Sequence, residues 1–228
     1  MKIGVGVKVK RYFIRLILVF SFSFLYAEGF LHERLEKRGL LNVQILESTI
    51  QVELKYASKD NFLGRDVYGD LKACYLQAQP AKMLARAQKI LQKTKPQFSL
   101  RLYDCLRPRQ VQYKMWDVVK GTPLEGYVAN PIRGSIHNYG AAVDLTVVDS
   151  RGIPLDMGTP FDFFGDLAQP RHEGFFLRKG KLSRTQLDNR LLLRRVMQEV
   201  GFLMIQNEWW HFNAFSLGEV KKKYQIVE

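Results

Sequence analysis

The chain has 228 residues, of which 46% are hydrophobic and 25% charged, and its formal net charge is +13. This length suits one domain with a proper core, and the composition excludes wholesale disorder. The basic excess would draw the protein weakly to anionic envelope surfaces. Nucleic acid is not expected as a partner, because no nucleic-acid motif is present and Lys221-Lys222-Lys223 is typical of a solvated tail.

The first 27 residues have the pattern of a secretory signal peptide. Five Lys or Arg side chains precede an apolar run from Leu16 to Leu25, and Ala27 stands before the first acidic residue, Glu28. The run is shorter than the roughly 20 apolar residues of a spanning helix, although an uncleaved anchor stays an open alternative. We therefore expect a signal peptide at 1–27, a mature domain at 28–228 that is exported to the periplasm, and no stable membrane insertion after cleavage.

The first half of the mature chain shows alternating helical and extended patterns. Residues 30–38 predict a short helix, and the apolar and polar alternation at 49–56 predicts a half-buried strand. The polar, turn-rich residues 57–64 could form the lip of a pocket. Pro80 opens a helix that runs to about residue 95, and residues 98–102 alternate again as a second strand.

A third helix is expected from Pro108, with Val111, Met115, Val118 and Val119 pointing inward. Residues 141–149 then predict a central strand. Residues 150–185 contain repeated Gly and Pro without clear periodicity, which is typical of a functional loop or a lid.

The last third closes the fold. Leu187, Leu191, Val196 and Val200 have helical spacing in a segment from Arg184 to Val200, and Gly201 ends it. Residues 202–205 and 209–215 predict two closing strands joined by a turn. The order of elements favours an α+β domain in which an antiparallel sheet carries helices on one side.

Two cysteines are present, Cys74 and Cys105. Export would permit a disulfide between them, and a pair of buried thiols is an equally good interpretation. Two cysteines are too few for a cysteine-based metal site, so the histidines matter more.

Two histidines and two acids in apolar surroundings indicate a hydrolytic metal site. Zinc in a hydrolase takes three nitrogen or oxygen ligands and leaves one position open for water, and His137, Asp144 and His211 satisfy that count. The turn at 138–140 would supply the flexibility that lets the first two converge. Glu208 lies three residues before His211, and a local bend in this aromatic segment would have to bring its carboxylate beside the metal.

In that position Glu208 could take a proton from the attacking water and pass it to the leaving amine. Arg107, at a junction between strand and helix, would place a fixed positive charge where the attacked carbonyl becomes an oxyanion. Each residue also has a structural interpretation, as a surface acid, a satisfied buried acid or the partner of a structural carboxylate. We assign His32 and His172 to the structural class.

The motif Ser-x-His-x-x-Gly-x-Ala-x-Asp at 135–144, with Glu-x-x-His at 208–211, resembles the zinc D-alanyl-D-alanine peptidases of the Hedgehog/DD-peptidase fold. Within them the chain is most similar to the VanX-type D-alanyl-D-alanine dipeptidases. Further matches are Leu54-Lys55-Tyr56-Ala57, Asn61-Phe62-Leu63-Gly64, Asp104-x-x-Arg107-Pro108, Asp144-Leu145-Thr146 and Met157-Gly158-Thr159-Pro160-Phe161-Asp162. Together they span most of the mature chain, and Leu106 replaces the tyrosine often found before that Arg-Pro pair.

The resemblance implies one zinc ion per chain, held by His137, Asp144 and His211. It also implies that Glu208 is the general base and that Arg107 stabilises the transition state.

For the substrate, the resemblance implies that Asp162 pairs with its free amine and that Ser135 helps to bind it. An acid facing the ammonium group of a dipeptide favours a short substrate, because a longer chain has no such charge at that point.

Our leading hypothesis is zinc-dependent hydrolysis of D-Ala-D-Ala to two D-alanines in cell-wall peptide turnover. The alternative within the same chemistry is a D,D-carboxypeptidase that trims peptidoglycan stem peptides. A non-catalytic wall-binding module is a different class, and the intact ligand set together with Glu208 argues against it.

Overall fold

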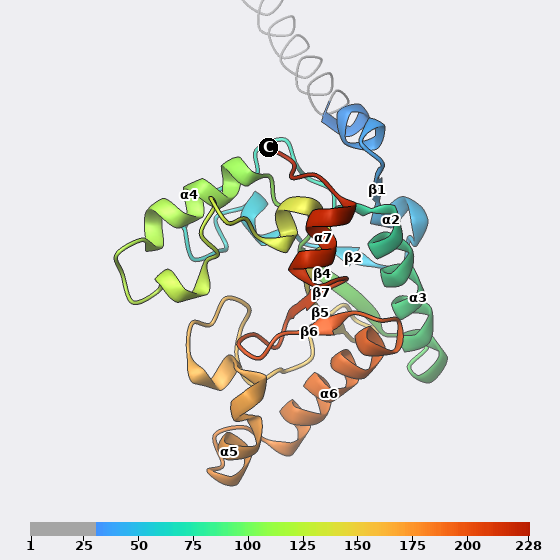
Figure 1. Cartoon of the computed structure of the whole chain (residues 1–228). Coiled ribbons are helices and arrows are strands. Elements are labelled where there is room, and N and C mark those ends of the chain that lie inside the picture. The colour runs from blue at the N-terminus through green and yellow to red at the C-terminus, as the bar shows by residue number, and fades with distance from the viewer. Residues whose placement is uncertain (1–30) are drawn as a thin grey trace, which may run out of the picture.

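The computed structural model describes residues 31–228, so the expected signal peptide and its cleavage site lie outside the described part (Figure 1). Helices and strands are mixed along the chain, which confirms the α+β class. Residues 31–37 are helical, as the pattern at 30–38 predicts. Within residues 31–228, no helix combines the length and the apolar character needed to cross a membrane.

The main sheet has five strands. Their spatial order is β2 (Gln51–Val52), β4 (Ser99–Asp104), β5 (Ala142–Val148), β7 (His211–Asn213) and β6 (Leu203–Met204). The expectation of an antiparallel sheet is wrong at one edge, where β2 runs parallel to β4. The reason is the connection between them, which includes helix α3 (Ala78–Thr94) and returns the chain to the end of the sheet from which β2 started.

Two predicted strands are shorter than expected. The strand at 49–56 pairs only at β2 and then turns into the 3-10 helix η1 (Lys55–Ala57). The Asn61 amide donates to the carbonyl oxygens of Lys55 and Ser58 at 3.0 and 2.8 Å, which folds this segment into a turn. The strand at 209–215 pairs only over β7, because the residues before it form a bend.

The helices lie on two sides of the sheet. Helix α3 packs against α6 (Arg184–Glu199), whereas α4 (Arg109–Val119) lies on the other side of the molecule (Figure 1). The expectation of helices on one side is therefore wrong for α4. Val118 of this helix was expected to point inward but is 44% exposed, because it lies at the edge of the apolar face centred on Met115.

Several further elements of the described chain are short. They include β1 (Leu40–Asn42) and β3 (Tyr75–Gln77), which form a separate antiparallel pair, α2 (Val43–Leu46), η2 (Glu125–Tyr127) and α7 (Leu217–Lys223). The lysines expected in a solvated tail therefore end a helix, where they are exposed.

The segment at 150–185 contains the short helices η4 (Asp166–Ala168), η5 (Pro170–His172) and α5 (Glu173–Arg178). It is anchored by Arg190 of α6, which is 2% exposed and donates to the carbonyl oxygens of Met157 at 2.7 Å and Leu167 at 3.0 Å. The fully buried positions of α6 thus include an arginine, whereas Leu187 and Leu191, expected at the core, are half-buried. This anchoring holds the loop in a defined conformation.

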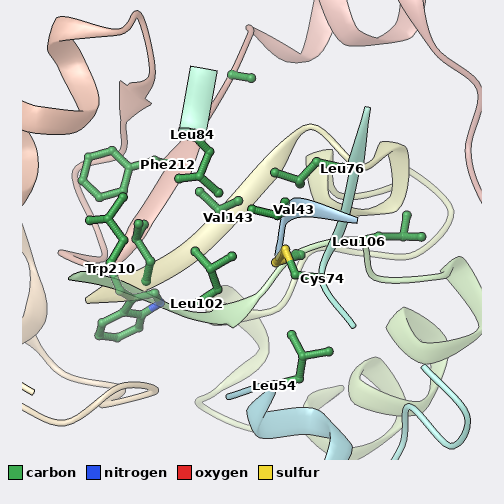
Figure 2. Packing of buried hydrophobic residues seen from close by; sticks show 14 of the residues in the cluster. Val43, Leu54, Cys74, Leu76, Leu84, Leu102, Leu106, Val143, Trp210 and Phe212 are labelled. Carbon is green, nitrogen blue, oxygen red and sulfur yellow. A yellow bond between two sulfur atoms is a disulfide. The ribbon is translucent and has the colours of Figure 1, made fainter. Parts of the chain in front are cut away.

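One hydrophobic cluster extends from Leu35 to Val227. Figure 2 shows part of it, including Leu102 and Val143 from the central strands. Cys74 and Cys105 lie inside this cluster and are joined by a disulfide. Burying each large aliphatic side chain contributes roughly 1.5–3 kcal/mol, so this cluster is the main source of stability beneath the site.

Candidate active site and metal centre

Three functional side chains form one row across the sheet. Asp104 of β4 is the register partner of Asp144 of β5, and Asp144 is the register partner of His211 of β7. Side chains directly opposite one another on neighbouring strands lie on the same face. The sheet itself therefore brings together residues that lie up to 107 positions apart in the sequence.

His137 reaches the same place from the 3-10 helix η3 (Ile136–Tyr139). Ser135 caps this helix, because its Oγ accepts the His137 N–H at 3.3 Å and Asn138 Oδ1 accepts the Ser135 N–H at 2.7 Å. Gly140 then turns the chain with a φ of +67°, where a Cβ would lie 2.7 Å from a leucine methyl group. The turn expected to be flexible is thus tightly packed, with Asn138 fully buried.

The donor atoms of His137, Asp144 and His211 lie within 4.8 Å of one another. His137 Nε2 is 3.2 Å from His211 Nδ1, and Asp144 Oδ1 is 2.9 Å from the same Nδ1. The distance from Asp144 Oδ1 to His137 Nε2 is 3.4 Å. A set of two imidazoles and one carboxylate at these distances has the composition of a catalytic zinc site.

The hydrogen bonds on the outer sides of the two imidazole rings leave the inner nitrogens free to bind a cation. His137 Nδ1 lies 2.7 Å from the Cys105 carbonyl oxygen, which can only accept, so the proton sits on Nδ1. His211 Nε2 donates in the same way to Asn213 Oδ1 at 2.9 Å. The lone pairs of both rings therefore face inward beside the Asp144 carboxylate, an arrangement that suits a metal ion and fixes the ring orientation.

The electrostatics of these residues also favour a positive charge between them. Burial would raise the pKa of Asp144, but the imidazoles of His137 and His211 outweigh it and hold this pKa well below its ordinary value. Burial lowers the pKa of His137, but Asp144 and Asp104 outweigh it and the net shift is upward. A divalent ion would take the place of the proton that this cluster attracts.

Arg107 stands between β4 and α4, at the expected junction. Its Nε donates to Asp104 Oδ2 at 2.9 Å, its Nη2 donates to the same carboxylate, and its Nη1 donates to Gln112 Oε1 at 3.0 Å. Burial lowers the pKa of Arg107, but the Asp104 carboxylate and its other partners raise it by more. The net shift of this pKa is upward, so the guanidinium stays charged. Its Nη2 is 3.8 Å from Asp144 Oδ2, which places a fixed positive charge beside the three-residue cluster.

Glu208 lies between β6 and β7, in a segment that bends as expected from the sequence. Its Oε2 is 4.0 Å from His211 Nδ1, and its side chain is 17% exposed. Burial raises the pKa of Glu208 to about 7, while the His211 ring opposes this shift. A carboxylate with a pKa near neutrality can both accept and return a proton at physiological pH.

Asp162 lies at the end of the anchored loop. Among residues 31–228 it is the only non-glycine residue with a positive φ, 59°, a conformation that Asp tolerates better than most residues. The Tyr56 hydroxyl lies 3.0 and 2.8 Å from its two carboxylate oxygens. Burial raises the pKa of Asp162 to about 7, while the Tyr56 hydrogen bond lowers it. The backbone thus holds a carboxylate in a strained position, which is typical of functional sites.

All seven predicted site residues line one cavity of about 350 Å³. They are Arg107, Ser135, His137, Asp144, Asp162, Glu208 and His211. Trp210 also contributes to the wall. Ligand cavities span roughly 300–1,000 Å³, so this one suits a small molecule with both charged and apolar parts.

A family model described as D-Ala-D-Ala dipeptidase matches residues 36–227. The chain belongs to the D-Ala-D-Ala dipeptidase family. A D-alanyl-D-alanine dipeptidase of Escherichia coli strain K12 is 34% identical over 173 residues, which cover 76% of this chain and 83% of the relative. An Enterococcus faecalis protein with the same description is 25% identical over 195 residues, covering 77% and 91%, and an Enterococcus faecium protein is 27% identical over 183 residues, covering 72% and 85%.

As a member of this dipeptidase family, the protein is a metallopeptidase. Three residues without a role predicted from the sequence each contact a predicted site residue: Tyr56, Asp104 and Asn213. The signal for Asp104 was its spacing of three residues from Arg107, and that for Tyr56 was its place beside the predicted pocket lip. Asn213 had no local signal, because its contact with His211 is visible only once the ring orientation is known.

His32, His172 and Leu106 do not line the cavity. His32 contacts the Tyr75 hydroxyl, and His172 packs against Phe176. Leu106 is 1% exposed and belongs to the hydrophobic cluster, so the residue that replaces a tyrosine faces the core.

Proposed function

We propose that this protein is a zinc-dependent dipeptidase that hydrolyses D-Ala-D-Ala to two D-alanines. The observation that carries the proposal is the Tyr56–Asp162 pair in the same cavity as the His137, Asp144 and His211 cluster. A half-buried carboxylate in a small cavity suits the free ammonium group of a dipeptide. The dipeptidase relatives support the same substrate.

In this proposal His137, Asp144 and His211 hold the zinc ion. The ion supplies positive charge that acidifies water and polarises the peptide carbonyl. The lone pairs that face inward and the outer hydrogen bonds to Cys105 and Asn213 support this assignment.

Glu208 acts as the general base. It removes a proton from the attacking water and later delivers that proton to the nitrogen of the departing D-alanine. Burial raises the pKa of Glu208 above its ordinary value, which makes this carboxylate a stronger base toward the attacking water. Its half-buried position beside His211 limits competition from bulk water.

Arg107 stabilises the oxyanion that forms on the attacked carbonyl. A guanidinium has five N–H donors, and three of them hold Asp104 and Gln112 in the described structure. The remaining donors can serve a substrate oxygen. Because Asp104 holds the plane of the group, little reorganisation is needed when negative charge develops.

Asp162 and Tyr56 bind the substrate amine, and Ser135 contributes from the capped turn before His137. Acylating the amine removes the positive charge and leaves the half-buried Asp162 carboxylate without a partner cation. The alternative of a D,D-carboxypeptidase acting on stem peptides is therefore not favoured, because such substrates are acylated at this position.

The test compares D-Ala-D-Ala with N-acetyl-D-Ala-D-Ala on the purified, zinc-loaded protein. We expect kcat/KM to fall by about 100-fold or more on acetylation, as for a site that loses a charged partner. Hydrolysis of the acetylated substrate alone would reject the dipeptidase proposal in favour of the carboxypeptidase.

We further propose that the domain adopts the Hedgehog/DD-peptidase fold and works in the periplasm on cell-wall peptides. The leader pattern at 1–27 supports export, and a buried disulfide is typical of an oxidising compartment. Cell fractionation with N-terminal sequencing tests this. A mature protein beginning at Glu28 in the periplasmic fraction is the expected result, and a cytoplasmic protein beginning at Met1 would contradict it.

A further inference from the structure

We propose that the Cys74–Cys105 disulfide is a positioning element of the active site, which holds the carbonyl that orients His137 and the segment that carries Arg107. The inference rests on the proposed zinc site. It assigns the two cysteines a part in catalysis through other residues, beyond the stability that a cross-link supplies.

Both backbone polar groups of Cys105 are used by the site. Its carbonyl oxygen accepts from His137 Nδ1 at 2.7 Å, and its N–H donates to Asp104 Oδ1 at 2.7 Å. Asp104 in turn holds the Arg107 guanidinium. A displacement of Cys105 would therefore disturb a proposed metal ligand and the oxyanion arginine together.

Little regular structure holds this segment. Strand β4 ends at Asp104 and α4 begins at Arg109, and residues 105–108 between them belong to no helix or strand. Outside α4, the bonds to the backbone of residues 106–108 are Leu106 N–H to Tyr75 O at 3.1 Å, Arg107 N–H to His137 O at 3.1 Å and Asn138 Nδ2 to Arg107 O at 2.8 Å. Of these bonds, only the one from Leu106 to Tyr75 connects the segment to residues outside the site.

The other end of the disulfide belongs to that framework. Cys74 directly precedes β3, is fully buried, and accepts the Val43 N–H on its carbonyl oxygen at 3.0 Å. Figure 2 shows Cys74 and its sulfur–sulfur bond among the core side chains, with Val43 and Leu106 close by. The cross-link thus fastens the irregular segment to the buried core.

This arrangement predicts a specific pattern of loss. Removing an outer partner of a metal-binding histidine weakens metal affinity or activity by roughly 10–100-fold. The amine-binding pair Tyr56–Asp162 comes from η1 and the anchored loop, neither of which contains Cys74 or Cys105, and the Tyr56 hydroxyl is held by Asp162 itself. Loss of the disulfide should therefore lower zinc affinity and kcat while KM stays close to the wild-type value.

The experiment uses the purified mature protein and the Cys74→Ser/Cys105→Ser variant. Zinc affinity is measured by competition with a chromogenic chelator, and kcat and KM for D-Ala-D-Ala are measured at saturating zinc. We expect zinc binding about 10-fold weaker and kcat about 10-fold lower, with KM nearly unchanged. Unchanged zinc affinity together with unchanged kcat would overturn the proposal.

A control separates positioning from general stability. Leu91→Ala removes a fully buried side chain of α3 that does not line the cavity, and it should lower the melting temperature while leaving zinc affinity and kcat unchanged. An equal loss of zinc affinity in this control would also overturn the proposal. If the double serine variant does not fold, the Cys74→Ala/Cys105→Ala variant and the reduced wild-type protein provide the same measurements.

The outcomes distinguish this inference from the proposed function. A wild-type protein that binds zinc but does not cleave D-Ala-D-Ala would reject the proposed substrate, and the zinc affinities would still decide the role of the disulfide. A wild-type protein that cleaves the dipeptide, with a disulfide-free variant equal to it in affinity and kcat, would reject the positioning role alone.

Discussion

Asp144 and His211 face each other across the antiparallel pair β5–β7, with Asp144 Oδ1 2.9 Å from His211 Nδ1. This cross-strand pair fixes two of the three proposed ligands relative to each other, because both side chains are set by the register of one strand pair. The third, His137, comes from the capped helix η3, which precedes β5 directly in the chain.

His211→Ala should abolish stoichiometric zinc binding, with an affinity loss of at least about 100-fold, because one ligand of three is removed. His172→Ala is the matched control, since that ring packs against Phe176 and lies outside the cavity. Metal content after dialysis checks both variants. Full zinc occupancy in His211→Ala would contradict the assigned ligand set.

Glu208→Gln should keep zinc bound but lower kcat by about 10²–10⁴-fold, because the amide cannot accept the proton of the attacking water. Glu199→Gln, an exposed acid at the end of α6, should leave kcat unchanged. Metal analysis together with D-Ala-D-Ala turnover makes the test. Wild-type turnover in Glu208→Gln would remove this residue from the mechanism.

The pKa of Glu208 should depend on the metal. Burial raises it to about 7 in the protein without metal, and a divalent cation beside it should lower it, because positive charge favours the carboxylate. Carbon NMR of glutamate-labelled protein, with Glu208→Gln to identify the signal, should show titration near pH 7 without zinc and at lower pH with zinc. A signal that titrates near 4.5 in both forms would refute this account.

Asp162→Asn should weaken the preference for a free amine. The neutral amide loses the charged pairing with the substrate ammonium, so KM for D-Ala-D-Ala should rise about 10–100-fold. The acetylated dipeptide, which has no ammonium group, should be affected much less. Asn also accepts the positive φ at this position, so the loop conformation should persist. An unchanged ratio between the two substrates would exclude Asp162 from amine recognition.

The same substitution should stabilise the protein at alkaline pH. Burial raises the pKa of Asp162 from 3.8 to about 7, so the folded state holds this proton more tightly than the unfolded state. The resulting stability is fully present below pH 3.8 and is lost as the pH rises through about 7. At pH above 7, Asp162→Asn should therefore raise the free energy of unfolding by up to about 4 kcal/mol, and by much less near pH 4.

Denaturant unfolding of the metal-free protein at both pH values measures this difference. Asp166→Asn, which replaces an exposed acid in the same loop, serves as the control and should change stability little at either pH. A stability gain for Asp162→Asn that does not grow with pH would show that ionisation of the Asp162 carboxylate does not lower the free energy of unfolding.

Helix prediction succeeded where the apolar period is long, as in α3 and α6, because a repeated stripe must be buried whatever surrounds it. Strand prediction was weaker at 49–56. There the side-chain amide of Asn61 donates hydrogen bonds to two backbone carbonyl oxygens, and the second half of the expected strand forms a turn. That contact depends on how the loop folds back, which local alternation does not encode.

The amino-acid sequence by itself determined the chemistry available to this protein: two imidazoles, a set of carboxylates and one arginine in otherwise apolar segments, in a spacing that matches a peptidase family. Only the tertiary structure decided that Asp104, Asp144 and His211 share one row, that Tyr56 meets Asp162, and that Cys105 supports His137. The reason is strand register and the packing of turns. A slip of one residue in β5 or β7 would send its functional side chain to the opposite face of the sheet, and no local pattern specifies that alignment.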